Sequence, residues 1–208
     1  PIQAAGGAQR MLYEVFIQEL TDWMGAMQID SGVSMGSWYY VASNNGYSAS
    51  VYADQSTAQW AYIGLESAEL SGRNYGVFVN NRHKYRIAHN LVRSQGNAGG
   101  SNYRSSGIKP NNLQITGGAF VGARWLGIHN MSRGNNTRPF PNETNYTQDQ
   151  LRAAYDRYVS FTANRWNTRS SSGSWNRSTV FWLNFDYLCG NTNSVYRWGN
   201  TAECGNMY

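Results

Sequence analysis

A chain of 208 residues is long enough to bury a sizeable core without metal or multiple disulfides, and we expect residues 1–208 to form a single domain. Only 14% of the residues are charged, whereas Gly, Tyr and Trp number 22, 15 and 8, a composition typical of secreted proteins. The net charge of +5 favours a polyanionic partner, with solvated basic loops as the alternative, and no apolar run reaches the roughly 20 residues of a membrane-spanning helix.

The hydrophobic pattern predicts an α+β fold that begins with a helix. Residues 8–27 repeat apolar positions every three to four residues and contain no proline, which predicts an N-terminal helix packed on the core. Between residues 37 and 89, short aromatic and β-branched runs alternate with Asn, Gly and Ser turns. This alternation predicts a mainly antiparallel sheet, with strands at residues 38–41, 60–63, 75–79 and 85–87.

A helical region follows the predicted sheet. The polar loop at residues 95–112 is followed by two more predicted helices, at 113–128 and 147–166. Near the C-terminus, Cys189 and Cys204 are close enough in sequence for one disulfide to pin the tail at residues 186–208, and two free thiols are the alternative. A disulfide would indicate an oxidising compartment.

Common catalytic and cofactor motifs are not found in the sequence. The three histidines lack the spacing of metal ligands, so we expect no metal site and no cofactor. The sequence also has no nucleophile elbow, phosphate loop or dinucleotide fingerprint. Glu66 and Glu69 are the types of residue that a glycosidase pair requires, but on a strand two residues three apart would face opposite sides.

Several short segments carry an ordered pattern of aromatic and basic residues. Residues 13–20 have the spacing Tyr-x-x-Phe-Ile-x-x-Leu, residues 74–80 contain Tyr75, and residues 101–104 contain Tyr103. The pattern continues with Leu-Gln-Ile-Thr-Gly at 113–117, Arg165 followed by Trp at 162–166, and an aromatic run at 181–185. In this order the segments resemble the A chain of ribosome-inactivating proteins, the plant and Shiga-type toxins that remove one adenine from ribosomal RNA. The resemblance covers nearly residues 10–190.

The resemblance implies a set of site residues. Tyr75 and Tyr103 would stack on the two faces of the adenine, with Tyr62 as the substitute for Tyr75, and Phe185 would stand where the family has its active-site tryptophan. Arg165 would stabilise the departing base.

The family's catalytic glutamate position is held by Thr162, which cannot supply the field of a carboxylate. Losing such a partner raises a barrier by about 2.7–4 kcal/mol, so we expect weak activity unless another acid serves. Asp186 is the first candidate for that acid, followed by Glu66 or Glu69.

The function implied by the resemblance is a secreted, toxin-like RNA N-glycosylase that acts on the ribosome in the cytosol of a target cell, with a separate cell-binding chain as an open question. One alternative is a catalytically silent relative that binds adenine or RNA. The other is a secreted carbohydrate-binding or carbohydrate-cleaving protein, because sugars stack on aromatic rings and hydrogen-bond to amides.

Overall fold

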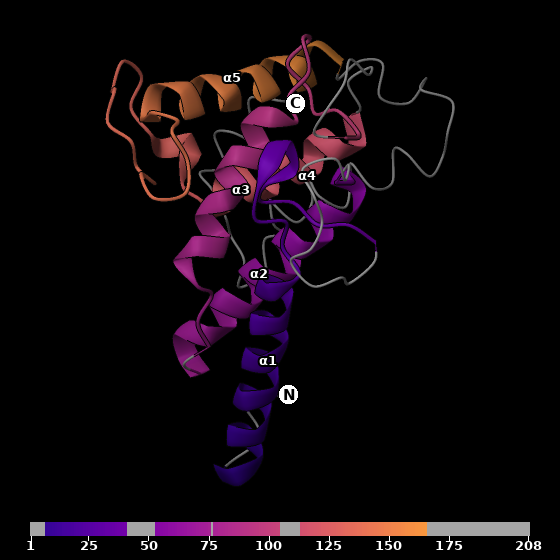
Figure 1. The fold of residues 1–208 in the computed structure, drawn as a ribbon, viewed down its shortest axis with the longest axis vertical. Helices are drawn as coiled ribbons and strands as arrows, with labels where there is room; N and C mark the ends of the chain where they lie inside the picture. The colour runs from indigo at the N-terminus through magenta and orange to yellow at the C-terminus, as the bar shows by residue number, and fades with distance from the viewer. Residues whose placement is uncertain (1–6, 41–52, 76, 105–112, 166–208) are drawn as a thin grey trace.

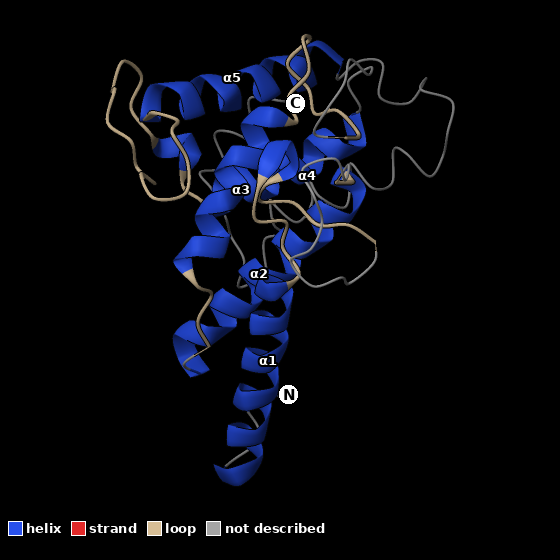
Figure 2. Ribbon diagram, viewed as in Figure 1, coloured by secondary structure: helices blue, strands red, loops and turns tan. Residues whose placement is uncertain are grey.

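The computed structural model describes residues 7–40, 53–75, 77–104 and 113–165. Within these ranges the chain is helical and contains no β-sheet, as Figure 2 shows. The extended pairings among the described residues are two isolated antiparallel bridges, Asp54 with Arg104 and Gln95 with Ser101. The elements are, in chain order, α1 (Gly7–Ala26), the 3-10 turn η2 (Gly32–Ser34), α2 (Gln55–Tyr75), α3 (Asn81–Arg93), α4 (Leu113–Trp125), the 3-10 turn η3 (Ile128–Asn130) and α5 (Gln148–Arg165).

The helices surround a central pair, α2 and α4. α1 projects from one end of the molecule and α5 lies across the other end (Figure 1). Two glycines let α4 come close to α2: a Cβ atom at Gly118 would lie 2.5 Å from the Cβ of Gln59, and one at Gly122 would lie 3.1 Å from the ring of Tyr62. Small residues at these positions therefore set the distance between the two central helices.

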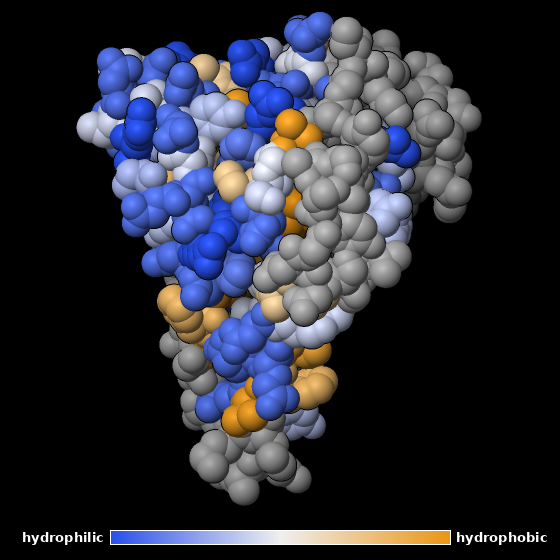
Figure 3. Space-filling model, viewed as in Figure 1, coloured by the Kyte–Doolittle hydropathy of each residue, from blue (hydrophilic) through white to orange (hydrophobic). Residues whose placement is uncertain are grey.

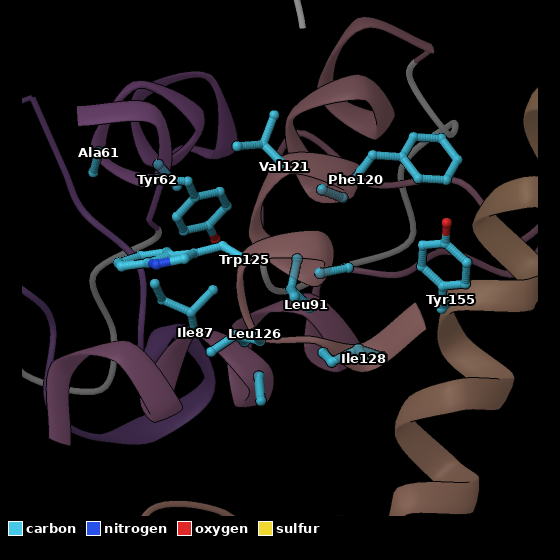
Figure 4. Close-up of a cluster of buried hydrophobic side chains, with 14 of the residues drawn as sticks. Ala61, Tyr62, Ile87, Leu91, Phe120, Val121, Trp125, Leu126, Ile128 and Tyr155 are labelled. Carbon is cyan, nitrogen blue, oxygen red and sulfur yellow. The ribbon is translucent and has the colours of Figure 1, made fainter. Parts of the chain in front are cut away.

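The core is formed by large side chains from α2, α3, α4 and α5 (Figure 4). The rings of Phe120 and Tyr155 meet edge to face, with centroids 5.8 Å apart and planes at 84°. Tyr62 and Tyr158 are each only 1% exposed, and burying a large side chain of this kind contributes about 1.5–3 kcal/mol. Their hydroxyls are hydrogen-bonded to Asn90 and to the carbonyl of Leu91, so this burial leaves no unpaired phenol.

The predicted antiparallel sheet is wrong. The runs predicted as strands at 60–63 and 85–87 belong to α2 and α3, residues 38–40 are irregular, and the run at 75–79 contains the end of α2 and part of the loop before α3. In α2 the buried side chains recur at helical spacing, at positions 58, 61, 62 and 65. Short aromatic runs were misleading because the strand preference of aromatic residues reflects burial more than backbone geometry.

The two misassigned helices have ordinary start signals. The Asp54 carboxylate accepts a hydrogen bond from the amide of Ser56 at 2.7 Å, at the start of α2. Asn80 does the same for the amide of Arg82 at 2.9 Å, at the start of α3. Such side chains satisfy amides that have no partner within the helix, so each one favours a helix over a strand.

The other three helices were predicted correctly, within a few residues at their ends. α1, α4 and α5 correspond to the predicted helices at 8–27, 113–128 and 147–166. α5 begins with a capping box, in which the Thr147 hydroxyl accepts from the amide of Gln150 at 3.2 Å and the Gln150 side chain accepts from the amide of Thr147 at 2.9 Å.

Two remaining predictions concern membrane-spanning helices and the C-terminal tail. None of the described helices combines the length and the apolar character needed to cross a lipid bilayer. Cys189, Cys204 and the tail at 186–208 lie outside the described residues.

Candidate functional site

Three chain segments meet at the N-terminal end of α2. The amide of Asp54 donates to the carbonyl of Trp38 at 3.4 Å, and the amide of Gln55 donates to the carbonyl of Tyr103 at 3.0 Å. These two backbone hydrogen bonds join the segment before α2 to residues 38–40 on one side and residues 101–104 on the other. The first turn of α2 is thereby fixed beside two tyrosines, Tyr40 and Tyr103.

Three hydroxyl groups converge where these segments meet. The Tyr40 hydroxyl lies 2.8 Å from the Ser56 Oγ, and the Tyr103 hydroxyl lies 3.3 Å from each of them. We call these three residues the hydroxyl cluster. Its two rings are accessible, since Tyr40 is 64% and Tyr103 38% exposed. Trp60, 54% exposed, is four residues after Ser56 on α2 and therefore lies on the same side of that helix.

The hydroxyl cluster is built for hydrogen bonding rather than proton transfer. The hydrogen bond with Ser56 lowers the pKa of Tyr103, but the bond with Tyr40, partial burial and the Asp54 carboxylate outweigh it and raise the pKa to about 12. Tyr103 is therefore a neutral phenol at physiological pH and is not poised as a base or nucleophile. A hydroxyl group has one donor and two acceptor positions, so the cluster can offer hydrogen bonds to a ligand.

A buried polar network holds the start of α2 in place beneath the cluster. The side-chain amides of Gln55 and Asn90 form a reciprocal pair, with N···O distances of 2.9 and 2.8 Å. Asn90 also donates to the hydroxyl of Tyr62 at 2.6 Å. Because buried amides lose free energy when they are left unpaired, this network fixes α2 relative to α3.

Of the site residues predicted from the resemblance, Tyr103 lies in the hydroxyl cluster. Thr162 is fully buried in α5, and its hydroxyl has no hydrogen-bond partner among the described residues. Tyr75 and Arg165 are the last residues of α2 and α5, and their side chains lie outside the described part of the chain. Asp186 and Phe185 also lie outside it. The pairing of Tyr75 with Tyr103 and the role of Asp186 therefore stay predictions.

The residues predicted to stand in for Tyr75 and for the catalytic acid have structural roles in the described fold. They are Tyr62, Glu66 and Glu69. Tyr62 is buried in the core and cannot stack on a ligand from solvent. Glu66 and Glu69 lie on a helix, so the argument that a strand turns them to opposite sides does not apply. Glu66 is fully buried, and the Glu69 carboxylate binds the Lys84 ammonium at 2.9 and 2.7 Å and the Trp125 indole N–H at 2.5 Å.

Sequence reasoning missed Tyr40 and Ser56. One signal was available for Ser56, because an Asp two residues before it is a typical start of a helix. No comparable signal existed for Tyr40, which lies 16 residues from Ser56 and 63 from Tyr103 in the sequence.

A cavity of about 360 Å³ lies beside α3 and is lined by Met35, His89 and residues 141–146. The acid in its wall, Glu143, accepts from the Arg86 guanidinium at 2.9 Å and so is already paired. In the described ranges, no three or more His, Cys, Asp or Glu residues are grouped as a metal site would require.

Comparisons of the chain with protein-family models, with curated proteins and with solved structures find no match. The candidate function therefore follows from the geometry of the hydroxyl cluster and its surroundings.

Proposed function

We propose that this protein binds a carbohydrate at the hydroxyl cluster. The observation that carries the proposal is the convergence of three hydroxyls beside exposed aromatic rings, at 2.8–3.3 Å from one another. A sugar has an apolar ring face and a rim of hydroxyls, so it needs a flat aromatic surface next to neutral hydrogen-bonding groups. Tyr40, Tyr103 and Trp60 supply the rings, and Ser56 adds a hydroxyl that carries no charge.

The buried Asp54 carboxylate at the cluster favours a neutral ligand over a nucleic acid, although Arg104, its partner in the antiparallel bridge, adds a positive charge beside Tyr103. Asp54 is only 6% exposed, and its carboxylate acts on the Tyr103 hydroxyl directly. A buried negative charge below the binding surface repels the phosphates of RNA, whereas it makes the oxygen of the Tyr103 hydroxyl a better acceptor for a hydroxyl of a sugar. A carbohydrate without acidic groups therefore fits this surface better than a polyanion.

A glycan array followed by calorimetry on the best ligand tests the proposal. We expect Tyr103→Ala and Trp60→Ala each to weaken binding about tenfold or more, because each removes an aromatic contact of about 1–3 kcal/mol. Phe78→Ala is the matched control. Phe78 is an exposed aromatic residue beyond the C-terminal end of α2, about 30 Å along that helix from Ser56, and its loss should leave binding unchanged. An array without any bound glycan would contradict the proposal.

The substitution Asp54→Asn distinguishes a carbohydrate ligand from an RNA ligand. Asparagine caps a helix about as well as aspartate, so α2 should keep its start while the charge is lost. We expect this variant to bind a glycan more weakly, because the Tyr103 hydroxyl oxygen becomes a weaker acceptor when the neighbouring carboxylate loses its charge. Binding to RNA should instead improve, so tighter RNA binding combined with unchanged glycan binding would count against the carbohydrate.

The RNA N-glycosylase implied by the resemblance is a second proposal, and one observation favours it. The loop that precedes Tyr103 packs on α5, where a Cβ atom at Gly100 would lie 2.5 Å from the ring of Phe161. Phe161 is the neighbour of Thr162, so two of the segments that carry the resemblance are adjacent. Adenine release from intact ribosomes, with Arg165→Ala as the control variant, tests this activity. Release that depends on Arg165 would support it, and no release would remove it.

A further inference from the structure

An apolar stripe on α1 faces solvent. Tyr13, Phe16, Leu20 and Trp23 are 48%, 57%, 46% and 50% exposed, and together they form what we call the α1 stripe. They are spaced three, four and three residues apart, which places them along one side of the helix for about three turns. Figure 3 shows apolar surface at the lower end of the molecule, where α1 lies.

α1 packs on the rest of the molecule with a different side. Thr21 and Gly25 are buried there, Met24 packs on the core, and a Cβ atom at Gly25 would lie 2.6 Å from the ring of His83. The Gln28 side chain donates to the carbonyl of His83 at 2.9 Å. At about 100° per residue, the α1 stripe lies within a sector of about 80°, centred about 130° away from this buried side. The α1 stripe is therefore an apolar side of the helix that the described fold leaves uncovered.

The α1 stripe exposes an apolar area typical of functional patches. At about 100 Å² for each half-exposed large side chain, its four residues expose roughly 400 Å². This supplies about half of the ~800 Å² that each partner buries in a standard interface. Phe78 is not part of the patch, because Gln18, whose side chain donates to the Phe78 carbonyl at 2.9 Å, lies on the side of α1 opposite the stripe.

We propose that α1 is a dimerisation helix, and that the α1 stripe packs against the α1 stripe of a second copy of this chain. The spacing of three, four and three residues is that of the a and d positions of a heptad, the pattern by which two helices pack along their length. A twofold dimer buries the same patch on both copies, so a single stripe is sufficient to make a closed assembly.

The charges around the stripe favour a helix over a membrane as its partner. Acidic residues outnumber basic ones in α1, with Glu14, Glu19 and Asp22 against Arg10. Helices that lie on membranes usually carry Lys and Arg beside their apolar side, because these residues are attracted to anionic lipids. An acidic flank weakens that attraction but does not prevent contact between two apolar helix surfaces.

Sedimentation velocity over a range of micromolar concentrations, with the full chain, tests the proposal. We expect the wild-type protein to form dimers, and Leu20→Glu and Phe16→Glu to weaken dimerisation at least about tenfold, because each places a charge in the centre of the interface. Val15→Glu is the matched control, since Val15 is 55% exposed on the same helix but lies outside the stripe. This variant should dimerise like the wild type, and circular dichroism should show unchanged helix content for all three.

Three results would overturn the proposal. The first is a wild-type protein that stays monomeric at all concentrations. The second is a dimer that the two stripe variants do not weaken, because another surface would then form the interface. The third is a monomer that co-sediments with uncharged phosphatidylcholine vesicles and loses this binding in Leu20→Glu, because a lipid surface would then cover the stripe.

Discussion

The substitution Gly36→Ala should destabilise the protein strongly. Gly36 has a φ of +85°, and a Cβ atom there would lie 1.9 Å from the carbonyl oxygen of Arg86 and 2.3 Å from its carbonyl carbon. Gly36 closes the turn that leads from α1 toward Tyr39 and Tyr40, with its amide donating to the carbonyl of Ile29 at 2.8 Å. The turn can therefore lie against α3 only because position 36 has no side chain.

Two free-energy costs add together in Gly36→Ala. A non-glycine residue in the left-handed region costs about 1–2 kcal/mol, and forcing an atom into a packed contact with the backbone costs about 1–3 kcal/mol more. Gly127→Ala isolates the first cost, because Gly127 has a φ of +71° but no atom within 4 Å of its Cβ position. We expect Gly127→Ala to lower the free energy of unfolding by about 1–2 kcal/mol and Gly36→Ala to lower it by about 2–5 kcal/mol.

Thermal and urea denaturation followed by circular dichroism measure both variants. A loss of 3.5 kcal/mol in a chain of this size would lower Tm by about 10 °C, and a loss of 1.5 kcal/mol by about 5 °C. Gly36→Ala should also weaken ligand binding at the hydroxyl cluster, since the turn positions Tyr40. Equal destabilisation by the two substitutions would refute the reasoning, because it would mean that the turn does not pack closely on α3.

Three further predictions concern buried polar groups. Asn90→Ala removes the hydrogen bond to the Tyr62 hydroxyl and both reciprocal bonds with the Gln55 amide, which should lower the free energy of unfolding by about 1–3 kcal/mol in urea denaturation. An unchanged midpoint would show that the network is dispensable. Burial and neighbouring arginines lower the pKa of His83 and His89, so the unfolded chain binds more protons below the ordinary histidine pKa of about 6.5. The free energy of unfolding should therefore be highest above about pH 6.5 and fall as the pH decreases toward 5. Replacing both histidines by Gln should make this fall smaller. A wild-type urea midpoint that stays constant over this pH range would contradict the prediction. Thr162→Val should keep or raise stability, because it removes a buried hydroxyl that has no partner among the described residues, and a loss above about 1 kcal/mol would show that this hydroxyl is bonded.

The sequence predicted helices where the periodic pattern was long. α1, α4 and α5 were found because apolar residues recur every three to four positions over 13 or more residues. α2 and α3 were missed because their short runs of aromatic and β-branched residues, at 60–63 and 85–87, fit a strand as well as a helix. The capping residues Asp54 and Asn80 were the local signals that could have identified both helices.

The candidate site was only partly visible in the sequence. Tyr103 was singled out, but for a role in an adenine sandwich with Tyr75. Its neighbours in the structure, Tyr40 and Ser56, are 63 and 47 residues away in the chain. Hydrogen bonds across such separations depend on how the segments pack, and the amino-acid pattern around each residue carries no information about that packing.

The sequence by itself determined the apolar periodicity of α1, the excess of aromatic and amide side chains, and the basic balance of the chain, because these are properties of composition and spacing. It did not determine which side of α1 would be buried. The tertiary structure buries Thr21 and Gly25 of α1 and leaves the α1 stripe exposed, because a residue without a side chain is needed where the helix passes His83. Local pattern fixes where a helix forms, whereas the shape and hydrogen-bonding groups of its neighbours decide which face it buries.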